Sequence, residues 1–271
     1  MSQNDQGLAQ IIQYMQSHWP SQVDPKWQVS LEEYPQILQA ILRDFTKHST
    51  RDRHLVRIAG LSGSGKTTQI LPAVEAYFKK QESQPILIAA RRFVKYHPHC
   101  EAIRDHYGPE NLRKHTDEFS TIMMFLSLKK LISQGYDIIL DVTLLDPAME
   151  AILLQMLTSA KYEILFTMIA ASPAVTEHFL QGRQWRHTKA TEAEFVRATR
   201  EALAFYAKTA PDLPIIIWSV YDEPPIYDGS IKDCLDVFAD YSSREELPKK
   251  DDDARRAAKI KYLTSHHHSA S

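Results

Sequence analysis

The sequence predicts an α/β protein in which a five-stranded parallel sheet is flanked by helices and preceded by a helical N-terminal extension. Two observations favour this class. Short apolar runs, typical of strands buried on both faces, alternate along the chain with longer segments of helical periodicity. A glycine-rich segment also stands between the first of these strands and the following helix, a common position for anion binding in parallel α/β folds.

The five expected strands are short and mostly apolar, and they lie at residues 54–59, 85–90, 136–141, 163–171 and 213–220. The expected helices lie between them, at residues 67–81, 101–107, 117–134, 147–159, 175–182 and 192–208. Residues 221–229 are expected to form a loop. Strands that alternate with helices imply parallel pairing, with ligands bound at the carboxyl ends of the strands.

Three parts of the chain are expected. Residues 1–50 are predicted to be helical, with a capping box at Ser30 and Glu33, and to pack on the core as an extension. Residues 51–241 are expected to form the α/β domain. Residues 242–271 alternate acidic and basic runs and end near three histidines, which indicates a charged tail, helical or flexible, without chemistry.

The composition sets limits on the partners of the chain. A net charge of −2 over 271 residues gives no indication of a nucleic-acid or membrane surface. No apolar run approaches the ~18 residues of a membrane helix, and residues 1–7 lack the pattern of a signal peptide. Cys100 and Cys234 lie far apart and match no metal spacing. We therefore expect a cytoplasmic protein with reduced cysteines.

The glycine-rich segment, GLSGSGKT at 60–67, matches the phosphate-loop pattern G-x-x-x-x-G-K-[ST] at every fixed position. Its glycines let successive backbone N–H groups point at phosphate oxygens, and the next helix turns its positive end toward the same anion. The motif predicts a P-loop NTPase or kinase fold that binds ATP or GTP with Mg²⁺. The expected nucleotide contacts are Gly60, Ser62, Gly63, Ser64, Gly65, Lys66, Thr67 and Thr68. Pro72 is expected to bend the helix after the loop.

An acid ends the third expected strand. In a phosphate-loop protein an acid at this place usually lies beside the metal, so Asp141 and Thr67 are expected to hold Mg²⁺. Thr143 adds a hydroxyl at the same edge. The alternative is an aspartate that caps the next turn.

Basic residues follow Gly182 at a spacing of three. If this segment is helical, Arg183, Arg186 and Lys189 share one face. Arginines that close over the transferred phosphoryl group stabilise its charge, so Arg183 and Arg186 are candidate catalytic residues of a lid. A basic face exposed to solvent is the alternative.

The end of the second expected strand carries two arginines. Arg91 and Arg92 suit a phosphorylated or otherwise anionic acceptor. Asp117 and Glu118 are expected to begin the next long helix. There they either hydrogen-bond sugar hydroxyls or cap the helix.

The order of these motifs resembles the zeta toxin family between about residues 30 and 230. The resemblance is carried by residues 63–67, Phe93 with His97-Pro98, the segment Gln134-Gly135-Tyr136, Asp141-x-Thr143 and Arg183. Members are kinases of bacterial toxin–antitoxin systems that phosphorylate UDP-activated amino sugars. The resemblance implies an acceptor near Phe93 and His97, Arg183 in a lid, and a small helical antitoxin as partner.

The sequence departs from this family on the acceptor side. The family places its catalytic base, an aspartate, two residues before the phenylalanine, and Arg91 stands at that position here. A further acid, in the helix after Ser120, is replaced by an apolar residue near Phe125. Such a base is worth about 10²–10⁴-fold in rate. Three alternatives follow: Asp141 or a neighbouring carboxylate takes the proton, the substrate differs, or the chain binds a nucleotide without catalysis and regulates a partner.

Overall fold

The structure is a computed structural model that describes residues 24–143, 147–180, 189–222, 224–244 and 252–265. The described residues form two compact units, which we treat one at a time. Unit 1 comprises the described residues up to Ser49 together with Ile88–Gln134. Unit 2 comprises Thr50–Leu87 and the described residues from Gly135 on.

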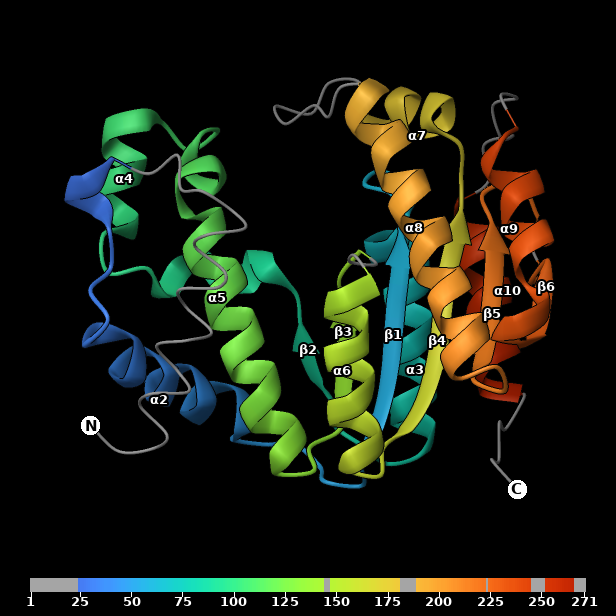
Figure 1. The fold of residues 1–271 in the computed structure, drawn as a ribbon, viewed down its shortest axis with the longest axis horizontal. Coiled ribbons are helices and arrows are strands. Elements are labelled where there is room, and N and C mark those ends of the chain that lie inside the picture. Colours follow the sequence, from blue (N-terminus) through green and yellow to red (C-terminus); the bar gives the residue numbers. More distant parts are fainter. Residues whose placement is uncertain (1–23, 144–146, 181–188, 223, 245–251, 266–271) are drawn as a thin grey trace. The chain divides into compact units, whose positions relative to one another are not determined.

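Unit 2 is built on a sheet in the order β2-β3-β1-β4-β5-β6 (Figure 1). The described strands are β1 (His54–Gly60), β2 (Ile86–Ile88), β3 (Ile138–Asp141), β4 (Glu163–Ala170), β5 (Pro214–Ser219) and β6 (Tyr227–Ser230). Strand β1 pairs in parallel with β3 and β4, and β4 pairs in parallel with β5. This arrangement confirms the predicted α/β class and brings the carboxyl ends of the central strands to one edge.

The sheet has one strand more than the five predicted. Strand β6, which the sequence placed largely in a loop, pairs antiparallel with β5. Its sequence, YDGS, is polar and only half-buried, because an edge strand needs no apolar run. Reading strands from apolar runs therefore misses it.

Helices cover both faces of the sheet in unit 2 (Figure 1). They are α3 (Leu71–Lys80), α6 (Pro147–Ser159), α7 (Pro173–Leu180), α8 (Lys189–Thr209), α9 (Leu235–Ser242) and α10 (Asp252–Ser265). Successive side chains of β1 point to opposite faces. Val56 and Ile58 join the apolar core with α3, whereas Arg57 points toward α6.

The C-terminal segment contains more order than a flexible tail. Helix α10 packs against α3, and Leu263 lies in the same core cluster. Two of its cations are buried: Arg255 donates to the carbonyl of Val220 (2.8 Å), and Lys259 lies 5.3 Å from the ring of Trp218. Alternating charges indicated a charged tail, helical or flexible, but these two side chains face the protein. The three-part division at residues 50 and 241 stays a prediction.

Unit 1 is helical. Its helices are α2 (Glu33–Thr46), α4 (Cys100–Tyr107) and α5 (Leu112–Ser133), with short 3₁₀ turns at Pro25–Trp27, Ala90–Arg92 and Val94–Tyr96. Helix α2 packs on α5, where the rings of Tyr34 and Phe119 are 6.0 Å apart. The backbone N–H of Ser30 donates to the Glu33 carboxylate (2.9 Å), as in a capping box, but the Ser30 hydroxyl donates to it as well (2.8 Å), and the N-cap of α2 is Glu32, not Ser30. Across the described ranges, no helix combines the length and apolar character needed to cross a bilayer.

Candidate nucleotide-binding site

The phosphate loop connects the end of β1 to the start of α3 in unit 2. All three of its glycines have a positive φ, and Gly60 and Gly65 show most clearly why glycine is needed. Gly60 has a φ of 135°, and a Cβ there would lie 2.9 Å from the carbonyl oxygen of Ile169 on β4. Gly65 has a φ of 95° at the cap of the following turn. Both conformations disfavour side chains, so the loop depends on glycine at these positions.

The loop is held by hydrogen bonds of its own. Ser64 is buried, and its hydroxyl donates to the carbonyl of Leu61 (2.8 Å). The Lys66 ammonium donates to the carbonyls of Gly60 (2.7 Å) and Leu61 (2.8 Å). The lysine therefore folds over its own loop, which keeps its charge beside the backbone that is expected to bind phosphate.

A wide turn leads from the loop into the helix. Residues Lys66–Ile70 form one π-helical turn, in which the N–H of Leu71 donates to the carbonyl of Lys66. Pro72 lies in the first turn of α3. Its ring has no N–H and crowds the carbonyl four residues earlier, so a wider turn accommodates it. The predicted effect of Pro72 thus takes the form of a π-turn, and Thr67 and Thr68 stay exposed on that turn.

Asp141 lies at the same edge of the sheet. It is the last residue of β3 and pairs with Ile58, two residues before the loop begins on β1. Its side chain is buried, with 6% of its surface exposed. Thr143 follows at the same edge and is half-buried. Unit 2 therefore brings together the loop, Asp141 and Thr143, as expected for parallel strands with a common carboxyl edge.

A buried ion pair between β1 and α6 supports the carboxyl edge of the sheet. It was not predicted from the sequence. Arg57 and Glu150, 1% and 0% exposed, form two hydrogen bonds of 2.6 and 2.8 Å. The Tyr206 hydroxyl donates to the same carboxylate (2.6 Å), and burial raises the pKa of Tyr206. Arg57 also donates to the carbonyl of Thr143 (3.4 Å). The pair thus fixes the segment after Asp141. In the sequence, the arginine inside an otherwise apolar strand was the feature that could have indicated this ion pair.

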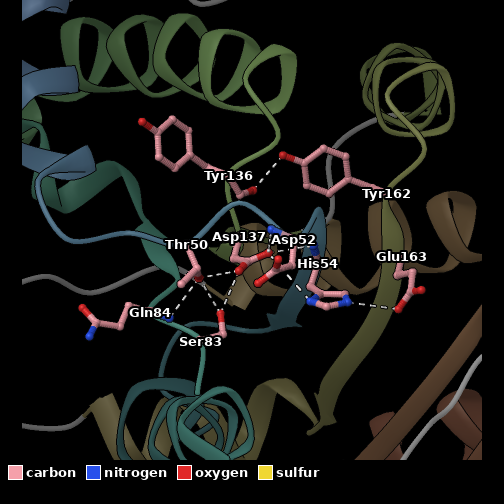
Figure 2. A network of polar contacts seen from close by, with 9 residues as sticks. All are labelled: Thr50, Asp52, His54, Ser83, Gln84, Tyr136, Asp137, Tyr162 and Glu163. Atoms are coloured by element: carbon pink, nitrogen blue, oxygen red, sulfur yellow. Dashed lines mark hydrogen bonds and ion pairs between the residues drawn. The ribbon is translucent and has the colours of Figure 1, made fainter. Parts of the chain in front are cut away.

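A second polar cluster lies at the amino ends of the strands (Figure 2). Asp137, which is fully buried, accepts from the backbone N–H groups of Asp52 (3.1 Å) and His54 (3.0 Å). Its other oxygen accepts from the hydroxyls of Ser83 (2.7 Å) and Thr50. Since four donors from the chain itself surround this carboxylate, its role is structural.

The same cluster extends across the strand ends. His54 Nε2 lies 3.2 Å from the Glu163 carboxylate, and the Tyr162 hydroxyl donates to the carbonyl of Tyr136 (2.7 Å) (Figure 2). The amino ends of β1, β3 and β4 are thereby joined, at the edge opposite the phosphate loop.

The predicted acceptor residues after β2 lie in unit 1 and differ in burial. Arg91 and Arg92 are exposed on the turn Ala90–Arg92. Phe93 is fully buried against the ring of Phe45, at 5.4 Å between centroids. His97, 4% exposed, packs edge-on against a ring of α5. Burial, and next the neighbouring His99, lowers the pKa of His97 to about 4. Phe93 and His97 therefore pack beneath the turn that presents the arginines.

The predicted start of the long helix is wrong. Helix α5 begins at Leu112, so Asp117 and Glu118 lie inside it and the capping alternative is excluded. The polar residues 113–116 carry no apolar periodicity, which is why the start was placed too late. Asp117 instead accepts from Arg113 (3.4 Å) on the same helix, and contact of Asp117 and Glu118 with an acceptor stays a prediction.

The predicted lid lies largely outside the described residues. Arg183 and Arg186 lie outside the described residues, and Lys189 is the first residue of α8.

The geometry defines a class of protein. A strand, a glycine loop and a helix, with an acid at the end of the adjacent parallel strand, form a kinase-like P-loop nucleotide-binding fold. The family model described as zeta toxin matches residues 39–210, and the chain belongs to that family.

A curated relative agrees with the assignment to the zeta toxin family. The chain is 26% identical over 146 residues to the toxin PezT of Streptococcus pneumoniae serotype 4 (strain ATCC BAA-334 / TIGR4). That match covers 53% of this chain and 56% of PezT, so the chain spans little more than half of that curated relative.

Solved structures support the fold. A structure from a study of the PezAT chromosomal toxin–antitoxin system of the same species has a TM-score of 0.65 at 21% identity. The match covers 89% of this chain and 99% of the other. The crystal structure of the AvrRxo1-ORF1:-ORF2 complex has a TM-score of 0.54 at 13% identity, covering 86% and 84%. Both similarities concern the fold alone.

Proposed function

We propose that this protein is a kinase that transfers the γ-phosphoryl group of ATP or GTP to a hydroxyl of a small anionic acceptor. The observation that carries the proposal is the phosphate loop in its strand–turn–helix setting, with Asp141 at the end of the adjacent strand, in a zeta toxin family member. The family suggests a UDP-amino sugar or a related nucleotide-sugar as acceptor.

Each group on the nucleotide side of the site has a proposed role. The loop amides and Lys66 bind the β- and γ-phosphates. A hydroxyl and a carboxylate are oxygen ligands of the kind that Mg²⁺ prefers, and Thr67 and Asp141 supply them from one edge of the sheet. When bound, Mg²⁺ neutralises charge on the phosphate oxygens. Arg183 and Arg186 remain the proposed lid arginines.

The acceptor side needs a base other than the one the family uses. Arg91 occupies that position, and a guanidinium does not accept a proton at neutral pH. We propose that Asp141, at the phosphate-loop edge of the sheet, or a neighbouring carboxylate accepts the proton. The partner proposed for the chain is an antitoxin protein, in keeping with the PezAT toxin–antitoxin study.

Arg91 also favours a second function. A nucleotide-binding protein without phosphoryl transfer, whose ATP-bound state regulates a partner, needs the loop but no base. The chain keeps Lys66, Thr67 and Asp141, the residues expected to hold phosphate and Mg²⁺. This weighs against the second function, because nucleotide binding without transfer does not require the complete set of metal ligands.

Labelled transfer tests the proposal. The purified chain is incubated with γ-labelled ATP, Mg²⁺ and a bacterial metabolite extract, and labelled products are identified by mass spectrometry. We expect label on a small phosphorylated acceptor, and none with Lys66→Ala, whose fold is checked by circular dichroism. Transfer to water alone, together with tight ATP binding, would replace the kinase by the regulatory function.

A further inference from the structure

A basic hollow lies in unit 1, where the chain follows β2 into α4. Its volume is about 380 Å³, within the lower range of small-molecule sites. It is lined by Arg91, Arg92, Val94, Lys95, Cys100 and Arg104. Four of these six side chains carry a positive charge, and none of them is acidic.

Three local elements build the hollow. The turns Ala90–Arg92 and Val94–Tyr96 contribute one group of side chains, and helix α4 contributes Cys100 and Arg104 from adjacent turns of one face. Helix α4 begins at Cys100, so its positive end lies at the same place. Arg104 was not among the predicted site residues, because only folding brings α4 beside the arginine turn.

Two neighbouring groups bear on the charge of the hollow, the Cys100 thiol and the Glu101 carboxylate. Burial raises the pKa of the Cys100 thiol, so the thiol is neutral at pH 7. Glu101 pairs with Arg104 on the surface of α4, with 2.6 Å between the carboxylate oxygen and the guanidinium nitrogen. Its side chain is 76% exposed, so this pair is weak and an anion can compete with it.

We propose that this hollow binds the phosphate or diphosphate group of a small molecule, through Arg91, Arg92, Lys95 and Arg104. Guanidinium groups bind phosphate oxygens in pairs, and several cations around one hollow suit a diphosphate. The assignment rests on the proposed function in taking this ligand to be the anionic part of the acceptor. It gives Arg91 a binding role at the position where the family carries its base.

The test is a titration of the full chain by calorimetry with UDP, pyrophosphate and uridine. The chain carries Lys66→Ala, which weakens phosphate binding at the loop. We expect both diphosphates to bind and uridine not to bind. If UDP binds more tightly than pyrophosphate, the hollow recognises a nucleotide. If the two bind equally, the hollow recognises the diphosphate group alone. Either result supports the site.

Matched variants locate the binding. Arg104→Gln and Lys95→Gln should each weaken diphosphate binding about threefold to tenfold, because each removes one charged hydrogen-bond donor. Glu101→Gln should strengthen it about twofold, since it removes the competing carboxylate. Arg43→Gln, at an exposed position of α2 outside the hollow, should change nothing. Lys95 is itself exposed, so its variant folds even if Arg104→Gln does not.

The outcomes separate this inference from the proposed kinase. No diphosphate binding, or equal affinities for Lys95→Gln, Arg104→Gln and Arg43→Gln, would overturn the site. Binding in the hollow with no transfer from ATP would reject the kinase and leave the site standing. If the chain transfers phosphate from ATP and the hollow variants do not change that transfer, the kinase would stand and the site would be rejected.

Discussion

Two aspartates four residues apart in the sequence, Asp137 and Asp141, have opposite surroundings. Asp137 precedes β3 and is enclosed by four donors from the chain, which satisfy its charge (Figure 2). Asp141 ends β3 at the edge where the phosphate loop begins. The comparison teaches that one strand can carry a structural acid at its amino end and a candidate functional acid at its carboxyl end. The predictions for Asp137 and Asp141 separate an effect on stability from an effect on ATP binding or turnover.

The largest effect is expected from the buried ion pair between Arg57 of β1 and Glu150 of α6. Glu150→Ala leaves the guanidinium of Arg57 buried without its carboxylate, which should cost about 3–5 kcal/mol of unfolding free energy. Urea denaturation measures it. Tyr206→Phe, which removes one hydrogen bond, should cost only about 1 kcal/mol.

The control for the ion pair is a double variant. Arg57→Met with Glu150→Leu replaces both charges by apolar groups of similar size and should recover most of the stability. If Glu150→Ala alone were neutral, the pair would not support the segment after Asp141.

Asp137→Ala should lower the unfolding free energy by about 3 kcal/mol, because two backbone N–H groups lose their buried acceptor. Asp137→Asn should cost about 1 kcal/mol, since the amide keeps one oxygen for the N–H groups and its NH₂ can donate to the hydroxyls. ATP affinity should be the same in both variants when it is measured by calorimetry. Weakened ATP binding without lost stability would contradict a structural role.

Asp141→Asn is expected to show the opposite behaviour. Turnover of ATP should fall at least ~10²-fold if the carboxylate acts at the metal or as base, while the midpoint of thermal unfolding changes little. Steady-state kinetics over a series of Mg²⁺ concentrations distinguishes the two roles, since only a metal ligand shifts the Mg²⁺ dependence. Turnover close to that of the unchanged chain would move both roles elsewhere.

The sequence predicted the parts of the molecule whose signals are local. Apolar runs identified the five strands β1 to β5, and the glycine pattern identified the loop in its setting. Residues 147–159 formed the predicted helix without a shift of boundaries. These features depend on neighbours in the chain, so periodicity and motif spacing suffice for them.

The missed features depend on contacts between distant residues. Arg57 and Glu150 are 93 positions apart, and their pairing follows only from the placement of α6 on the sheet. Lys259 belongs to the charge run predicted to form a helical or flexible tail, but it lies against Trp218. Arg104 joins the basic hollow because α4 folds beside the arginine turn. Periodicity along the chain records none of these contacts.

The last prediction concerns a buried histidine of unit 1. His97 has a pKa of about 4, below its usual 6.5, because burial disfavours the charged ring. Between these values the unfolded chain binds a proton that the folded chain does not, so stability falls as the pH drops from about 6.5 toward 4. We expect a loss of about 2 kcal/mol over that window, measured by urea denaturation at several pH values.

A matched pair of variants assigns this pH dependence. His97→Gln should flatten the slope between pH 6.5 and 4, whereas His48→Gln, at an exposed position of unit 1, should leave it unchanged. An unaltered slope in His97→Gln would show that another group titrates. Because His97 packs beneath the turn that carries Arg91 and Arg92, loss of diphosphate binding should accompany acid destabilisation, while ATP affinity at the loop of unit 2 should respond less.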